Sequence, residues 1–323
     1  MQSFTCPASG DRVYFDNLAC GCGAQLYYEP EARAMWNEAM PCANRDIIGC
    51  NWAVAPGETL CRACLMTGII PDFSVGNNQE LLARAERAKR WVLANISNWG
   101  WFTDADQGPS PSFQMLSEYI AGSEERIMMG YGGGIITINV TEADELIRLQ
   151  RQHQLREQYR SMVGHFRHEI AHFLFNRLSV ASGFLEAFRT VFGDERTDYG
   201  AALQEHYANP KLTNGEFITN YATAHPHEDW AETTAHLLHM VDFTDSFVSA
   251  GLSMAGVPEN YTPYQDGNAQ HLLTITTDVA IAMNDINRAL DNSDLYPFVL
   301  TPRIREKLSF VHDWVMHHAE RGA

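Results

Sequence analysis

The sequence predicts an α+β protein, with a small cysteine-rich domain at the N-terminus and a larger, mainly helical part after it. Three observations lead to this prediction. All seven cysteines lie between Cys6 and Cys64 of a 323-residue chain. Apolar residues at helical spacing dominate from residue 80 onward, and residues 135–140 alternate with the period of a β-strand. Strands are therefore expected to be few and early.

The composition is that of a globular chain with an acidic excess. Hydrophobic residues make up 45% and charged residues 20%, and the formal net charge is -17 at pH 7. This charge repels phosphate backbones, so it disfavours nucleic acid as a partner. The N-terminal residues show no secretory pattern, and no apolar run approaches a membrane span. We therefore expect a cytoplasmic protein with no membrane partner.

The cysteine-rich domain is expected to span residues 1–75 and the second domain residues 76–323. Turn residues are frequent in the first part, and the amphipathic run Glu29–Met40 is predicted to be a short helix. The breakers within residues 68–80 mark the linker.

Four cysteines have the spacing of a structural zinc site. Cys61 and Cys64 form a C-x-x-C pair, and Cys42 and Cys50 precede it at distances that a ribbon loop spans. Four thiolates close a tetrahedral zinc site, and in so small a domain this metal supplies much of the folding free energy. A redox C-x-x-C is the alternative, but the sequence around it lacks the expected βαβ pattern.

The second domain is predicted to begin with a helix over Glu80–Ile96, followed by a glycine turn at 132–134 and the strand Ile135–Val140. Thr141, with Asp144 three residues later, is expected to cap a helix that continues through Leu178. A break in that helix is expected near residues 153–160. The rest is predicted to be mostly helical, with loops at 193–200, 208–215, 256–267 and 291–302.

A cluster of titratable side chains lies in His168-Glu169-Ile170-Ala171-His172, an H-E-x-x-H sequence on a predicted buried helix. Positions i and i+4 share a helix face, so His168 and His172 can bind one metal ion. Zinc lowers the pKa of a bound water toward about 7, and Glu169 can accept its proton as the water attacks a carbonyl. The alternative is a chance match in a chain with 13 histidines, but the apolar helix favours a metal site. We interpret His165 as a packing residue or as a support for a ligand.

A catalytic zinc needs a third protein ligand. Two downstream stretches offer candidates for that role, residues 192–207 and residues 221–239. Glu228 and Glu232 are spaced i, i+4 on a helix that starts after Pro226, so Glu228 can bind the metal while Glu232 supports a ligand histidine. The alternative is that both are solvated acids, favoured in a first turn by the helix dipole. The other candidates are Asp194, Glu195, Asp198 and His206 in the first stretch, and His225, His227 and Asp229 in the second.

These stretches resemble a known family. H-E-I-A-H followed by E-D-W-A-E resembles the gluzincin pattern of anthrax lethal factor and the bacterial MtfA peptidases. Nearly end to end, the chain is similar to a bacterial family of zinc-binding metallopeptidases with an N-terminal zinc ribbon. The matching stretches are CANRDIIGCNW, LCRAC, GIITINVTEAD, YRSMVGHFRHEIAH, FGDERTDYGAAL, HPHEDWAET and DLYPFVL.

The resemblance implies a zincin-like catalytic domain with His168, His172 and Glu228 as zinc ligands and Glu169 as general base. Tyr221 falls where lethal-factor-type enzymes keep a tyrosine near the scissile carbonyl, and a phenol there can stabilise an oxyanion. An ordinary core tyrosine is the alternative. Zincin architecture further implies that the strand at 135–140 is an edge strand that pairs with extended substrate.

The remaining cysteines depart from the family. Relatives would show C-x-x-C pairs, whereas here Ser9 stands where the partner of Cys6 is expected, and Cys20 and Cys22 are separated by one residue. Three thiolates without a histidine nearby predict a weak or absent site. We therefore expect one structural zinc in this domain and one catalytic zinc in the next.

The function that we predict is a cytoplasmic zinc metallopeptidase acting on a protein or peptide substrate, with the ribbon recruiting that substrate or a protein partner. The alternative is a non-catalytic zinc-binding interaction module that acts through the ribbon. A closed site at His168 would favour that module, whereas three protein ligands and a water would favour the enzyme. Nucleic-acid binding by the ribbon is weakened by the net charge and by the few cations nearby, Arg33, Arg45 and Arg62.

Overall fold

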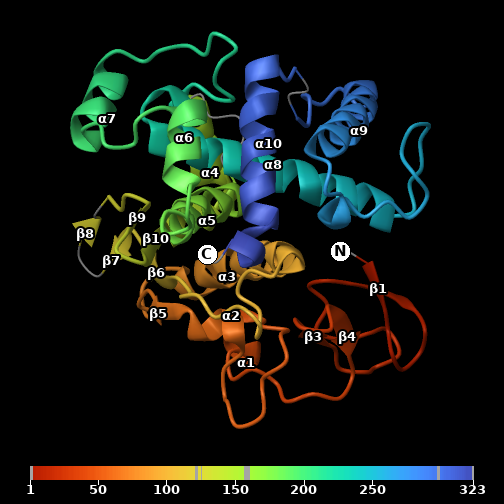
Figure 1. The fold of residues 1–323 in the computed structure, drawn as a ribbon. Coiled ribbons are helices and arrows are strands. Elements are labelled where there is room, and N and C mark those ends of the chain that lie inside the picture. The colour runs from red at the N-terminus through yellow and green to blue at the C-terminus, as the bar shows by residue number, and fades with distance from the viewer. Residues whose placement is uncertain (1–2, 121–122, 125, 156–160, 297–298, 322–323) are drawn as a thin grey trace. The chain divides into compact units, whose positions relative to one another are not determined.

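The computed structural model describes residues 3–120, 123–124, 126–155, 161–296 and 299–321 (Figure 1). Its contacts divide the chain into two compact units, residues 1–173 and 174–323, and the division falls inside the continuous helix α5 (Met162–Leu178). The predicted α+β class is confirmed, because all described strands lie in the first unit and the second unit's described elements are helices. The domain boundary at 75/76 stays a prediction.

Two β-hairpins form the first part of the cysteine-rich region. β1 (Ser3–Thr5) pairs with β2 (Arg12–Tyr14), and β3 (Tyr27–Glu29) pairs with β4 (Ala34–Trp36), both antiparallel. The helix predicted over Glu29–Met40 is therefore wrong. Tyr28 and Met35 are cross-strand partners that are both buried, and this packing outweighs the helical spacing of the run.

A four-stranded mixed sheet with the order β5-β6-β10-β9 follows. Its strands are β5 (Thr67–Ile69), β6 (Ser112–Leu116), β9 (Gly130–Gly132) and β10 (Ile135–Asn139). The strand predicted at 135–140 is confirmed, but its expected edge position is wrong. β10 pairs in parallel with β6 and antiparallel with β9, so β9 forms that edge of the sheet. A further small hairpin joins β7 (Tyr119–Ile120) and β8 (Ser123–Glu124).

Helices of the first unit pack beside this sheet. The predicted helix at 80–96 is confirmed as α3 (Asn78–Ile96), which runs into the 3-10 turn η1 (Ser97–Trp99). The predicted cap at Thr141 is wrong, because the 3-10 turn η2 (Val140–Ala143) intervenes before α4 (Glu145–Leu155). Asp144 caps α4 by accepting from the backbone N–H of Leu146, at 2.9 Å. Most of the expected break near 153–160 lies outside the described residues.

The second unit is a group of helices around an aromatic core. The described helices are α6 (Phe184–Phe192), α7 (Tyr199–Ala208), α8 (Pro226–Ser249), α9 (Ala269–Ala289) and α10 (Pro302–Met316), with the 3-10 turns η3 (Tyr221–Thr223), η4 (Pro263–Gln265) and η5 (His318–Arg321). They are separated at the predicted loops. Trp230 of α8 is fully buried among rings of α5, α6 and α10. No described helix is both long and apolar enough to cross a membrane.

Candidate metal centres

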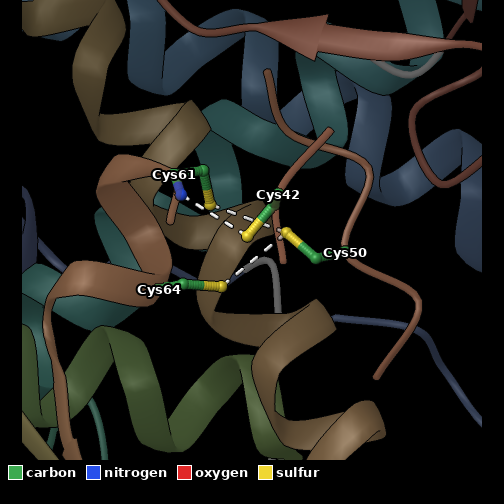
Figure 2. A group of neighbouring side chains, drawn as sticks. All are labelled: Cys42, Cys50, Cys61 and Cys64. Carbon is green, nitrogen blue, oxygen red and sulfur yellow. Dashed lines mark hydrogen bonds between the residues drawn. The ribbon is translucent and has the colours of Figure 1, made fainter. Parts of the chain in front are cut away.

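Four cysteines of the first unit form a compact group, which we call the four-cysteine centre (Figure 2). Cys42, Cys50, Cys61 and Cys64 are all buried, and their Sγ atoms lie within 4.8 Å of one another. The Sγ of Cys50 is 3.5 Å from that of Cys61 and 3.7 Å from that of Cys64. Sulfur ligands of a tetrahedral zinc lie about 3.8 Å apart, whereas a disulfide needs about 2.0 Å. The spacing therefore fits a zinc-bound set.

Local backbone geometry brings these sulfurs together. Cys50 follows Gly49, which ends the short helix α1 (Arg45–Ile48) in the left-handed conformation, with φ 66°. Cys61 is the N-cap of α2 (Arg62–Leu65), and Cys64 lies within it. Hydrogen bonds with Cys50 and Cys61 lower the pKa of Cys42.

The other three cysteines, which we call the three-cysteine set, also lie together. The Sγ atoms of Cys6, Cys20 and Cys22 are within 4.8 Å of one another. Their grouping contrasts with the weak or absent site that the irregular spacing predicts.

The two histidines of the H-E-I-A-H stretch, the histidine pair, face one another on α5. The Nε2 atoms of His168 and His172 are 3.2 Å apart, with ring planes 78° apart. Nitrogen ligands of a tetrahedral zinc lie about 3.3 Å apart, so the pair fits two ligands of one ion. Ile170 and Ala171, between them, are fully buried, and Glu169 is 6% exposed.

His165, one turn before the pair, belongs to an ion-pair network. Its Nε2 lies 2.9 Å from Oε2 of Glu142, whose Oε1 accepts from Arg151 at 3.0 Å. This contact ties the start of α5 to η2, which agrees with a packing role for His165.

In the second unit, Glu228 lies buried in the first turn of α8. Its Oε1 accepts a hydrogen bond from the hydroxyl of Tyr199, at 2.6 Å. Sequence reasoning missed Tyr199: it lies 29 residues from Glu228, and no local spacing relates the two. The only sequence signal was its place in the FGDERTDYGAAL stretch. The bond holds one oxygen of the carboxylate in a defined direction.

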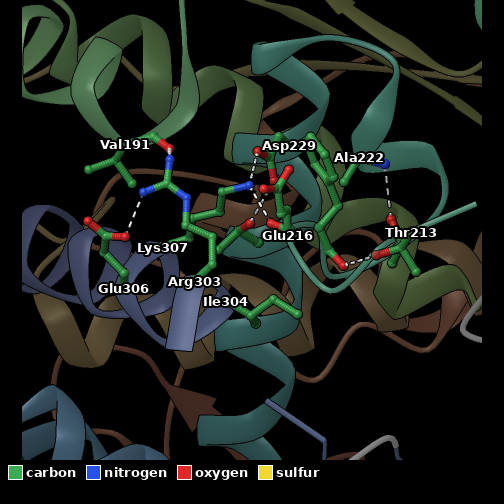
Figure 3. Close-up of polar contacts among 12 residues, drawn as sticks. Val191, Thr213, Glu216, Ala222, Asp229, Arg303, Ile304, Glu306 and Lys307 are labelled. Atoms are coloured by element: carbon green, nitrogen blue, oxygen red, sulfur yellow. Dashed lines mark hydrogen bonds and ion pairs between the residues drawn. The ribbon is translucent and has the colours of Figure 1, made fainter. Parts of the chain in front are cut away.

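The residue next to Glu228 anchors the same turn of α8. Asp229 accepts from Nζ of Lys307 on α10, at 2.6 Å, and both side chains are buried (Figure 3). Lys307 also donates to the backbone carbonyl of Glu216, at 2.7 Å. Burial raises the pKa of Asp229 to about 6, although Lys307 opposes that shift. This ion pair makes Asp229 a structural residue of the second unit.

Most competing candidates for the third ligand have structural partners. Asp194 pairs with Arg196, and Glu195 pairs with Arg189. The side chain of Asp198 caps α7 by accepting from Ala201 N–H, at 2.9 Å. His225 caps α8: its Nδ1 accepts from His227 N–H at 3.1 Å, and its Nε2 faces the carbonyl oxygen of Thr197 at 3.1 Å. These contacts use the groups that a metal would need.

Three further predicted residues lie in the second unit. Glu232, one turn later on α8, accepts from the hydroxyl of Thr219 at 2.7 Å. His206 faces the hydroxyl of Thr223, at 3.3 Å from its Nδ1. Burial, together with the charge of Glu228, raises the pKa of Tyr221 well above its usual range. The phenol of Tyr221 therefore stays protonated and can act as a donor.

Comparisons with known proteins agree with these centres. A family described as "Putative zinc-binding metallo-peptidase" matches residues 78–314, and one described as "zinc-ribbon domain" matches residues 3–75. Uncharacterized proteins of Mycobacterium bovis and Mycobacterium tuberculosis are 34% identical over 97% of this chain and 94% of their own length. No solved structure matches significantly.

The resemblance to a family of zinc-binding metallopeptidases with an N-terminal zinc ribbon is confirmed by these matches. Zinc binding is supported by both family descriptions and by the grouped cysteines. The chain belongs to the family described as "Putative zinc-binding metallo-peptidase", and it carries a zinc-ribbon domain at its N-terminus.

Proposed function

We propose that this protein is a zinc-dependent peptidase, with His168, His172 and Glu228 as ligands of a catalytic zinc and Glu169 as general base. The observation that carries the proposal is the histidine pair. Two imidazole nitrogens face each other 3.2 Å apart on a buried helix, and a buried glutamate follows the first of them. This arrangement serves metal-assisted hydrolysis better than a closed structural site, because it leaves coordination positions for other ligands.

The continuity of α5 supports Glu228 as the third ligand. Phe175 is seven residues after His168 and three after His172, so the three side chains share one helix face. Within the second unit, the ring of Phe175 lies 4.5 Å from that of His227 and 6.0 Å from that of Trp230. Phe175, three residues after His172 on the same helix, thus packs within the second unit against the first turns of α8.

The chain's own residues have distinct roles in the proposed reaction. Zinc, when bound, would supply a Lewis acid that lowers the pKa of a water. Glu169 would accept the proton of that water as it attacks the peptide carbonyl. Tyr199 would hold the Glu228 carboxylate through its 2.6 Å hydrogen bond. Tyr221, protonated, would donate to the developing oxyanion.

The four-cysteine centre would hold one structural zinc. Its sulfurs are buried and fill all four tetrahedral positions, so that zinc would stabilise the ribbon without taking part in hydrolysis. We propose that the ribbon recruits the protein or peptide substrate, or a protein partner. Cysteines grouped for zinc rather than for disulfides are typical of a reducing compartment, which supports a cytoplasmic location.

Glu169→Gln tests the proposal. The amide is nearly isosteric but accepts no proton, so the variant should keep its zinc and lose hydrolysis of a mixed peptide library. Zinc per chain is measured by mass spectrometry of the metal, and cleavage by peptide mass spectrometry. Glu145→Gln, at the exposed start of α4, is the matched control and should cleave normally. Full turnover by Glu169→Gln would remove this glutamate from the mechanism. A zinc-loaded wild type without hydrolysis would favour the non-catalytic module.

A further inference from the structure

The three-cysteine set has the dimensions of a metal site. Cys6 and Cys20 are buried and Cys22 is exposed. The Sγ atoms of Cys6 and Cys22 are 3.9 Å apart, close to the roughly 3.8 Å that separates two thiolates on a tetrahedral zinc. A disulfide would need about 2.0 Å. The sulfurs are therefore spaced for a shared ion.

The side chain of Ser9 lies beside this set. Its Oγ is 3.5 Å from Sγ of Cys20, which is also about the distance between an oxygen and a sulfur ligand of one zinc ion. The hydroxyl donates to Asp11 at 2.8 Å. A hydroxyl stays protonated near neutral pH and binds zinc far more weakly than a thiolate does, so the fourth position is left to exchangeable water.

Two similar turns hold Cys6 and Cys20 in place. In the first turn, Gly10 N–H bonds to the carbonyl of Cys6 at 2.9 Å; in the second, Gly23 N–H bonds to that of Cys20 at 2.9 Å. Both glycines have left-handed φ angles, 79° and 91°. Backbone N–H groups of Ala8 and Ser9 donate to the Cys6 sulfur, and that of Cys22 donates to the Cys20 sulfur. Such donors stabilise charged sulfur, the form in which a cysteine binds a metal.

We propose that Cys6, Cys20 and Cys22 bind a second zinc ion in the ribbon, and that its fourth position beside Ser9 is open to water. The four-cysteine centre is closed and buried, whereas this site has three strong ligands and one exposed sulfur. Its zinc therefore exchanges with the medium while the other zinc stays bound. The fold around β1 and β2 becomes dependent on available zinc, which revises the single ribbon zinc expected from the sequence.

The test uses the full chain and four proteins: wild type, Cys22→Ser, Ser9→Cys and Ser9→Ala. Zinc per chain is measured after dialysis against micromolar zinc, and zinc release to a chromogenic chelator is followed in time. Wild type should show a fast phase of one zinc. Cys22→Ser should lose that zinc and that phase while the helical far-ultraviolet signal is retained, because the strands β1 and β2 that depend on this zinc have only three residues each.

The Ser9 variants keep the test decisive if Cys22→Ser misfolds. Ser9→Cys supplies a fourth thiolate, so the fast phase should slow by at least about tenfold, the low end of what a supporting partner alone contributes. Ser9→Ala should release its zinc as fast as the wild type does. Three outcomes would each overturn the proposal. They are equal zinc contents in wild type and Cys22→Ser, a Cys6–Cys22 disulfide found by mass spectrometry of the unreduced protein, and unaltered zinc release from Ser9→Cys. The zinc of the histidine pair is common to all four proteins and cancels in the comparison.

Discussion

The four-cysteine centre and the histidine pair differ in how far they are built from neighbouring residues. The first takes all four ligands from residues 42–64, where two short helices and a left-handed glycine set the sulfurs. The second takes two nitrogens from one turn of α5 and leaves room for other groups. A closed set of four thiolates therefore suits a structural metal, whereas an open histidine pair beside a buried glutamate suits a catalytic metal.

The largest expected effect follows from removing one ligand of the four-cysteine centre. Cys64→Ser removes one of four thiolates, and structural zinc contributes about 10–16 kcal/mol to the folding of such small domains. We expect the variant to lose one zinc and residues 3–75 to become sensitive to limited proteolysis. Leu65→Ser, at an exposed neighbouring position, is the control and should keep that zinc. An unchanged zinc count in Cys64→Ser would contradict the ligand assignment.

The next largest effect is expected at the proposed zinc site of the histidine pair and Glu228. Glu228→Ala removes a proposed ligand, so zinc affinity measured by competition with a chelator should fall sharply. Glu232→Ala should lower it by roughly 10–100-fold, the usual effect of losing a group that supports a ligand. His225→Ala and Asp198→Ala are controls, since both residues cap helices. Loss of the metal in either control, with the metal retained in Glu228→Ala, would assign the site to another zincin branch.

A smaller effect is expected at the ion pair that anchors α8. Lys307→Met leaves Asp229 buried without its cation, and breaking a buried pair costs about 3–5 kcal/mol. Thermal unfolding should therefore begin at a lower temperature than in the wild type. The double variant Lys307→Met with Asp229→Asn should recover part of the loss, because it removes the remaining buried charge. Unfolding of Lys307→Met at the wild-type temperature would contradict a stabilising role for this ion pair.

The smallest effect should come from Tyr199→Phe. The substitution removes the 2.6 Å bond to Glu228 but keeps the ring, and a hydrogen bond to a charged group contributes about 1.5–3 kcal/mol. Zinc affinity should fall by roughly 10–100-fold with little change in helix content. Tyr14→Phe, an exposed tyrosine of the first hairpin, is the control. An affinity equal to that of the wild type would leave Tyr199 without a role in holding the carboxylate.

Predictions from short-range spacing succeeded where one element sets the geometry. The helix at 80–96 and the strand at 135–139 depend on periodicity within one segment, and both were found. The predictions that failed needed knowledge of neighbours. Residues 29–40 have helical spacing, yet Tyr28 and Met35 bury each other across a hairpin. Nothing within residues 135–140 indicates that β9 pairs with one edge of this strand.

Spacing along the chain is enough to group the candidate ligands that lie within one or two turns of each other. A C-x-x-C or H-E-x-x-H spacing places donor atoms on the same side of a helix whatever surrounds it. The contacts between residues far apart in the sequence are known only from the folded structure. They are Tyr199 with Glu228, Lys307 with Asp229, and Ser9 with Cys20. These contacts depend on how separate elements pack. Burial and side-chain direction select the partners, and neither is written in the spacing of residues along the chain.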